Sequence, residues 1–343
     1  MKKILLFVLT ALLLLSCAPK PSDGPIVPKV RYELSGGAGH YDYAPSFIKD
    51  KYGIIYGFLC ENRDPFEIVD YIYLYKGILR DGEYVWQPAT QIIAPSESGW
   101  DCCHICDPDV REFTTHYKGE TYYWIMTYLG VDQWDCNHNQ IGLAFSKNIE
   151  GPYIKFDKNP LIPYEGRDKW GTGQSTTIVL NDTTIRVFYH STTENGPYCC
   201  RDIELADLDN IVIGPERAIK FLPPNSYPAI YGDNIFMVSE LRDDNYERIV
   251  PTWVGNECRV QYMKNTEEMF TAAENPWTEI GSVKEADTGF PRGHNPGFLT
   301  DTKGYLLTDQ ELVVYFTPAV TGEDWLWSYD LWSATFDTST IFK

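Results

Sequence analysis

The sequence predicts an all-β protein organised as a five-bladed β-propeller with long loops on one face. First, apolar and polar residues alternate in short runs, and the 343-residue chain shows no long stretch with the 3.6-residue period of an amphipathic helix. Second, a short segment built around a proline or serine recurs five times along the chain. Third, each copy is followed by a turn and then by a strand-like run rich in aromatic and β-branched residues.

The recurrent segments define the expected blades. They read APSFI, DPDV, QSTTI, YPAI and NPGF, with their second residues at positions 45, 108, 175, 228 and 296. The runs that follow read GIIYGF, TYYWIMTY, IRVFYH, NIFMVS and LVVYFT. Intervals of about 53 to 68 residues exceed those of short-blade repeats, so four strands per unit leave room for long, functional loops. A β-sandwich of unrelated strand pairs is the alternative fold.

The first residues have the features of a bacterial export signal. A charged start at residues 1–3 precedes an apolar run over 4–15, which is too short to span a bilayer as a stable helix. The sequence LLSC, which ends at Cys17, resembles the lipobox of bacterial lipoproteins. This resemblance implies cleavage before Cys17 and a lipid on its sulfur, which would hold the protein at a membrane. An ordinary signal peptide with an incidental cysteine is the alternative.

Three parts of the chain are therefore expected. They are a lipoprotein signal peptide over residues 1–16, a lipid-anchored tether over 17–30 and a propeller domain of catalytic type over 31–343. The expected location is the cell envelope of a bacterium, lipid-anchored, in the periplasm or on the outer-membrane surface.

The charge balance argues against nucleic acid as a partner. The chain carries 48 acidic and 29 basic residues and a net charge of −19, whereas phosphate binding depends on clusters of lysine and arginine. Aromatic residues make up 15% of the chain, which suits both β-sheet packing and flat platforms for ligands.

Several fragments occur in a distinctive order along the chain. They are DPDV at 107–110, YKG at 117–119, YYW at 122–124, IGLAFS at 141–146, EGPY at 150–153, WGTGQS at 170–175 and GHN at 293–295. In this order they resemble the five-bladed propeller glycosidases, especially glycoside hydrolase family 43, over most of residues 40–320. The resemblance implies cleavage of glycosidic bonds in plant or host oligosaccharides or polysaccharide fragments. A carboxylate acid/base pair in the central propeller pocket would do this chemistry.

Glycoside cleavage usually needs two carboxyl groups, one as acid and one as base or nucleophile. The resemblance implies an aspartate at the start of the first inner strand, a second aspartate that tunes the pair, and a glutamate acid in a later blade. This sequence departs from that pattern, because Ala44 replaces the first aspartate and the segment around Tyr227 lacks the glutamate. Asp42 lies two residues before Ala44, on the same face of the strand.

The expected catalytic set is Asp42 as base, Asp107 as base or pKa-tuning partner, and Glu240 as acid, with Glu194 in reserve. Each has a structural alternative. Asp42 and Asp107 could cap turns, and Glu240 could be a solvated residue at a strand end.

Sugar recognition usually combines aromatic faces with planar polar groups. The candidates beside the inner strands are Trp100, His104, Trp170, Gln174, Arg292 and His294. The resemblance implies that His294 lines the channel floor and helps to hold a metal ion or a water network; a buried core histidine is the alternative. No cofactor is expected to be required, and an ion near acids and carbonyls in the central channel would be Ca²⁺.

The stretch GWDCCHICDPDV at 99–110 leaves three interpretations open. Zinc ligation could use Cys103 and Cys106 with a second pair formed by Cys136 and His138, although the spacing of that second pair is poor. Disulfides are the better default in an exported protein. We expect the cysteines here and the adjacent pair at 199–200 to brace the pocket rim, with Asp107 directed at the channel.

Two other functions remain open at this stage. Ala44 and the missing glutamate near Tyr227 are compatible with a lipid-anchored carbohydrate-binding protein that has lost catalysis. A scaffold for protein partners would instead have a channel plugged by apolar side chains.

Overall fold

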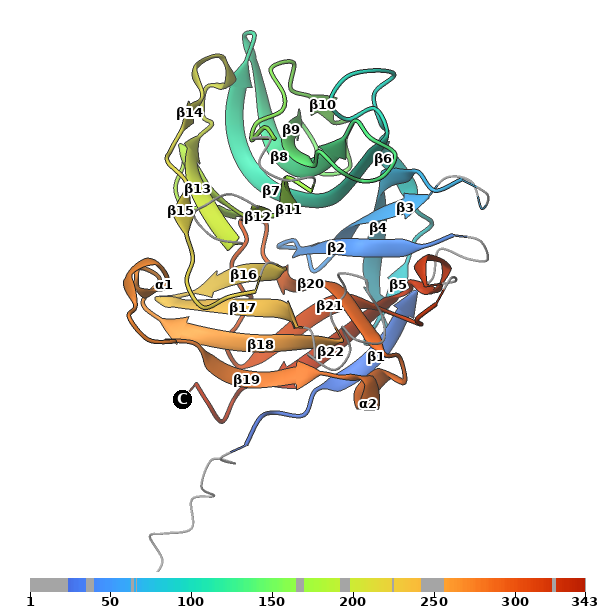
Figure 1. Cartoon of the computed structure of the whole chain (residues 1–343), viewed down its shortest axis with the longest axis vertical. Coiled ribbons are helices and arrows are strands. Elements are labelled where there is room, and N and C mark those ends of the chain that lie inside the picture. The colour runs from blue at the N-terminus through green and yellow to red at the C-terminus, as the bar shows by residue number, and fades with distance from the viewer. Residues whose placement is uncertain are drawn as a thin grey trace, which may run out of the picture.

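The computed structural model describes residues 24–34, 40–62, 65, 67–164, 170–191, 198–223, 225–241, 256–322 and 325–342. The reserve candidate Glu194 and the expected lipid site Cys17 lie outside these residues. Almost every element is a strand, and the strands form antiparallel sheets arranged around a common axis (Figure 1). The predicted five-bladed propeller is confirmed.

The first three blades follow one another along the chain. Blade one contains β2 (Asp42–Lys49), β3 (Ile55–Asn62), β4 (Asp70–Arg80), β5 (Glu83–Trp86) and β6 (Thr90–Ile93). Blade two contains β7 (His104–Tyr117), β8 (Glu120–Val131), β9 (Gln140–Ser146) and β10 (Ile154–Lys155). Blade three contains β11 (Thr172–Val179), β12 (Thr184–Ser191), β13 (Tyr198–Glu204), β14 (Val212–Ile213) and β15 (Arg217–Ala218).

The last two blades hold the helical turns α1 (Glu268–Thr271), α2 (Glu285–Thr288) and η2 (Leu326–Ser328); a further turn, η1 (Leu208–Asn210), follows β13. Blade four contains β16 (Ser226–Tyr231), β17 (Asn234–Leu241), β18 (Glu257–Lys264) and β19 (Thr278–Val283). Blade five contains β20 (Arg292–Thr300), β21 (Glu311–Ala319), β22 (Leu331–Asp337) and β1 (Lys29–Leu34). None of the helices that the structure describes has the length and apolar character needed to cross a membrane.

Both ends of the chain meet in blade five and close the ring. The N-terminal strand β1 pairs antiparallel with β22, and β20 pairs parallel with β2 of blade one (Figure 1). The backbone N–H of Ile26 also donates to the carbonyl of Ile280 in β19 of blade four, at 2.7 Å. The last two residues of the expected tether 17–30, Lys29 and Val30, therefore belong to blade five.

Each recurrent segment of the sequence forms the innermost strand of a blade, namely β2, β7, β11, β16 and β20, and the aromatic run that follows forms the second strand. Four of these inner strands carry a β-bulge, at which one residue adopts a left-handed backbone conformation. These residues are Ala44 (φ 51°), Asp107 (φ 45°), Gln174 (φ 54°) and Asn295 (φ 41°). Such a conformation costs a non-glycine residue roughly 1–2 kcal/mol, so the surroundings of each bulge must hold it.

Apolar side chains fill the space between neighbouring blades. The packing explains the adjacent cysteines of β13, because successive side chains of a strand point to opposite faces. Cys199 packs between blades two and three, whereas Cys200 packs between blades three and four. Both are buried between blades and neither forms a disulfide, so the expectation that they brace the pocket rim is wrong.

A polar network joins the inner strands beside the central channel. Asp109 accepts a hydrogen bond from Ser46 Oγ at 2.8 Å and pairs with Arg111 at 2.8 Å. Arg111 Nε also donates to the carbonyl of Thr177 at 2.6 Å, so three blades are joined here. The cavity at this network, of about 30 Å³, has room for roughly two water molecules, and both polar and apolar side chains line it.

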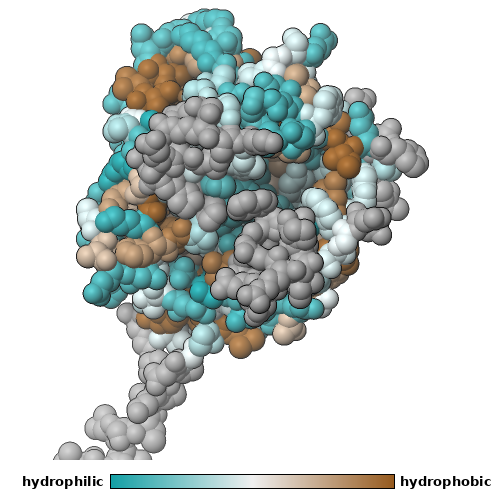
Figure 2. Space-filling model, in the orientation of Figure 1, coloured by the Kyte–Doolittle hydropathy of each residue, from teal (hydrophilic) through white to brown (hydrophobic). Residues whose placement is uncertain are grey.

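The face of the molecule in Figure 2 is mainly hydrophilic, with apolar groups in separate patches. This pattern agrees with the net charge of −19.

Candidate active site

Asp107 lies at the bulge of β7, where the inner strands converge, and its side chain is almost fully buried. Asn295 Nδ2 donates to Asp107 Oδ1 at 3.0 Å. Burial raises the pKa of Asp107 to about 7, and the negative charges of Asp70 and Glu240 act in the same direction, while a backbone hydrogen bond from Gln174 opposes them. A carboxyl group with this pKa is suited to proton transfer near neutral pH.

Glu240, near the end of β17, presents the second carboxyl group of the site and is also buried. Its Oε2 atom lies 3.0 Å from His294 Nδ1 and accepts hydrogen bonds from the backbone N–H of Asn295 and from Asn225 Nδ2, both at 3.3 Å. Donors that converge on one carboxylate oxygen stabilise its ionised form.

Asn295 bridges the two carboxyl groups. Its side-chain amide bonds to Asp107 and its backbone N–H bonds to Glu240. Its Oδ1 atom accepts from Tyr227 OH at 3.1 Å and from Gln174 Nε2 at 3.3 Å, which fixes the orientation of the amide.

Asp42, the expected base, lies at the start of β2 in blade one. Its Oδ1 atom accepts from Tyr75 OH at 3.2 Å, and the same hydroxyl bonds to Glu61 at 2.9 Å. The base role of Asp42 stays a prediction. The neighbouring side chain, Tyr43, stacks on His294.

Asp70, at the start of β4, is a third carboxyl group that the sequence analysis missed. Its Oδ1 atom accepts from Tyr41 OH at 2.8 Å and its Oδ2 atom lies 3.1 Å from His104 Nδ1. Its charge is also the second-largest cause of the raised pKa of Asp107. No recurrent motif marks the start of an outer strand, so the sequence carried no signal for it.

Two of the predicted sugar-binding residues have structural roles. Trp100 packs on Tyr128 with a centroid distance of 5.5 Å, and a Cβ atom at Gly130 or Gly142 would come within 2.5 Å of its ring. His104 is buried, and its Nδ1 atom lies beside the carboxylate of Asp70.

The positions of Trp170 and Gln174 agree better with the expected role in sugar binding. The ring of Trp170 stacks on His190 at 4.4 Å, in the blade that carries Gln174. Gln174 Nε2 belongs to the hydrogen-bond network of Asn295, while its Oε1 atom is buried without a hydrogen-bond partner.

Aromatic rings form one wall beside Glu240. His294 stacks against Tyr43 and Tyr329, with centroid distances of 6.1 and 5.3 Å. Arg292 donates from Nη2 to Tyr329 OH at 2.5 Å, and its guanidinium lies 4.4 Å from the ring of Trp325. Arg292 and His294, the two residues predicted in blade five, therefore both lie beside Glu240 or its aromatic wall. Arg292 orients the wall through its hydrogen bond to Tyr329.

The donors near His294 do not fit a calcium ion. His294 Nδ1 contacts Glu240, and in the channel the guanidinium of Arg111 neutralises Asp109. Calcium prefers six or more oxygen ligands, and a fixed cation in the channel opposes a second one.

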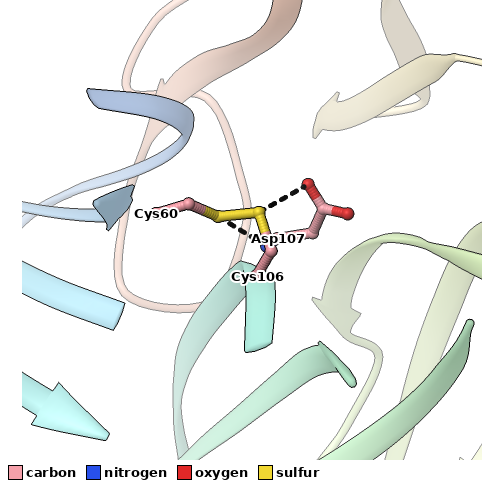
Figure 3. A group of neighbouring side chains, drawn as sticks. All are labelled: Cys60, Cys106 and Asp107. Carbon is pink, nitrogen blue, oxygen red and sulfur yellow. Dashed lines mark hydrogen bonds between the residues drawn. A yellow bond between two sulfur atoms is a disulfide. The ribbon is translucent and has the colours of Figure 1, made fainter. Parts of the chain in front are cut away.

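A disulfide stands directly beside Asp107. Cys60 of β3 is bonded to Cys106 of β7, whereas Cys102, Cys103 and Cys136 are free (Figure 3). Among the described residues, the only close group of possible metal ligands is Cys60, Cys106 and Asp107, and its two sulfurs are bonded to each other. The structure therefore agrees with the disulfide interpretation of residues 99–110 and not with the zinc interpretation.

Solved structures share the whole architecture of this chain. A family 117 glycoside hydrolase of the marine bacterium Zobellia galactanivorans superimposes with a TM-score of 0.58 at 13% identity, covering 92% of this chain and 91% of that one. The α-L-arabinofuranosidase PaAbf62A of Podospora anserina, in complex with cellotriose, gives a TM-score of 0.57 at 11% identity, with 92% and 96% covered. A GH43_1 enzyme of Xanthomonas citri, complexed with xylotriose, gives 0.53 at 11% identity, with 89% and 90% covered.

No protein-family model matches the chain, and no curated protein matches it. The likeness to solved structures therefore concerns the fold. The chain has the five-bladed propeller fold of the glycoside hydrolase structures to which it is similar.

Proposed function

We propose that the protein is a glycoside hydrolase in which Asp107 is the general acid and Glu240 is the base or nucleophile. The observation that carries this proposal is the Asn295 bridge, which sets the two buried carboxyl groups on either side of one residue. Two carboxyl groups in unlike surroundings are the requirement for glycoside cleavage.

The surroundings assign the two roles in the reverse of the sequence-based expectation. Asp107 keeps its proton near neutral pH because of burial and neighbouring negative charge, so it can protonate the departing glycosidic oxygen. Glu240 faces the imidazole of His294 and a backbone N–H, which favour the carboxylate that a base or nucleophile needs. The aromatic wall of Tyr43, His294 and Tyr329 supplies flat surfaces beside this pair.

The substrate class follows from the same features. The structural neighbours from Podospora anserina and Xanthomonas citri are complexed with cellotriose and xylotriose. An oligosaccharide or polysaccharide fragment is accordingly the proposed partner, and the net charge of −19 continues to argue against nucleic acid.

We also propose that the protein is exported and lipid-anchored through Cys17 in the bacterial cell envelope. The lipobox-like LLSC sequence supports this proposal. A buried disulfide between two blades supports it independently, because such bonds persist in oxidising compartments.

The test is hydrolysis of a panel of aryl glycosides and oligosaccharides by the mature protein. Glu240→Gln should abolish turnover of every substrate and Asp107→Asn that of the oligosaccharides, whereas the surface variant Glu150→Gln should keep both activities. Asp107→Asn should retain most activity on aryl glycosides with good leaving groups if Asp107 is the acid, since these groups depart without protonation.

A sugar-binding protein without catalysis is the second candidate, and Ala44 at the first bulge favours it because that position offers no carboxyl group. No turnover on any substrate, together with sugar binding by calorimetry, would establish this alternative.

A further inference from the structure

We propose that the Cys60–Cys106 disulfide is a positioning element for Asp107, which holds the bulge from which the carboxyl group of Asp107 meets Asn295. The proposal rests on the glycosidase function proposed above. It assigns a role to a bond that the acid/base chemistry does not itself use.

The disulfide is placed directly at the bulge. Cys106 precedes Asp107 in the chain, and the bond ties it to the second strand of blade one. Both cysteines are buried, so no solvent layer separates the bond from the site. Figure 3 shows the bonded sulfurs and the carboxyl group of Asp107 facing one another. The Cys106 sulfur is 3.7 Å from Asp107 Oδ1, a contact without a proton because a bonded sulfur carries none.

The disulfide also receives the backbone N–H that the bulge releases. The register of β7 and β8 shifts between Cys106 and Asp109, so the N–H of Asp107 leaves the strand ladder. It donates instead to Cys60 Sγ at 3.0 Å (Figure 3). A buried N–H needs an acceptor, and this sulfur supplies it.

At two other bulges the released backbone N–H also has an acceptor, and there the acceptor is a carboxyl group. The backbone of Asn295 donates to Glu240, and the backbone of Gln174 donates to Asp107. At each of these positions the freed N–H holds a carboxyl group of the site. At Asp107 the acceptor is the sulfur of Cys60, which is fixed by its bond to Cys106. This hydrogen bond holds the backbone of Asp107 and not a carboxyl group.

Breaking the bond should release this arrangement. A dithiol reductant supplies two electrons and two protons, converts the bond into two thiols and becomes a disulfide itself. The unbonded sulfurs of the adjacent residues Cys102 and Cys103 lie 4.0 Å apart, which is a non-bonded contact distance. The sulfur of Cys60 would move away from the N–H of Asp107, and the left-handed bulge would lose its support.

The experiment compares Cys60→Ala/Cys106→Ala with Cys199→Ala/Cys200→Ala, which removes two buried sulfurs of β13 that pack in the cores between blades. The first variant should lower kcat by about tenfold or more, because displacing a reacting group by about 1 Å costs up to 10²-fold. KM should stay within about twofold, since binding contacts are kept. The control variant should keep both parameters.

Carbon-13 NMR titration of the aspartate carboxyl groups, with Asp107→Asn for assignment, gives a readout that needs no substrate. Loss of the disulfide should let water reach Asp107 and move its pKa from about 7 toward the ordinary value. An unchanged Asp107 titration would overturn the positioning role, whether or not the protein hydrolyses glycosides. If the double variant does not fold, the same titration on the wild-type chain with and without dithiothreitol, with free thiols counted by mass spectrometry, decides the matter in its place.

Discussion

Asn295 Nδ2 lies 3.0 Å from Asp107 Oδ1, so the carboxyl group of blade two is held by an amide of blade five. The two residues occupy the same bulge position in their blades. Ring closure thus brings residues 188 positions apart in the chain into one site.

Asn295→Ala should lower kcat/KM by roughly 10- to 100-fold, because a lost hydrogen bond to a buried carboxyl group costs about 1–3 kcal/mol. Steady-state kinetics on the best glycoside of the panel will measure the effect. The exposed residue Asn181 provides the control Asn181→Ala, which should behave as wild type. Equal kinetics for both variants would contradict the bridging role.

The pH profile of kcat/KM should fall above about pH 7, since Asp107 with a pKa of about 7 must be protonated to act as the acid. Each further pH unit should then cost about tenfold. A rate that keeps rising up to pH 9 would exclude Asp107 as the proton donor.

The same group should make folding stability depend on pH. The folded-state pKa of Asp107, about 7, lies above its ordinary value of 3.8, so the native state binds more protons between these values. The unfolding free energy should therefore fall as pH rises through this window, by an amount on the order of 4 kcal/mol. Urea unfolding of wild type and Asp107→Asn from pH 4 to pH 8 will measure this change. As the pH rises, the unfolding free energy of wild type should fall relative to that of Asp107→Asn.

Asp70→Asn should move the upper limb of the pH–activity profile to lower pH. The negative charge of Asp70 raises the pKa of Asp107, so its removal should lower that pKa. Glu67→Gln removes a charge from the exposed segment just before β4 and should leave the profile in place. An unshifted limb in Asp70→Asn would show that the two carboxyl groups do not interact.

Asp109→Ala should destabilise the fold by about 3–5 kcal/mol, because it leaves the buried guanidinium of Arg111 without its partner. Chemical denaturation will measure the loss. Asp157→Ala, which breaks the exposed pair with Lys118, should hardly change stability. Similar small effects in both variants would show that the channel network does not join the blades.

The sequence alone determined the blades and marked one residue of the candidate site. Strand-like runs at a regular interval predict a repeat, because each blade must bury the faces of its own short strands against its neighbours. The DPDV segment also marks Asp107, since a carboxyl group beside a proline at the start of an inner strand is a local feature.

Only the tertiary structure decided which groups Asp107 meets. Asp70, Asn295 and Cys60 come from three different strands, and the sequence contains no local sign that they converge. The base role expected of Asp42 depended on strand alternation, which the bulge at Ala44 interrupts. Contacts across the axis follow from ring closure and from bulge geometry, and both are properties of the folded chain as a whole.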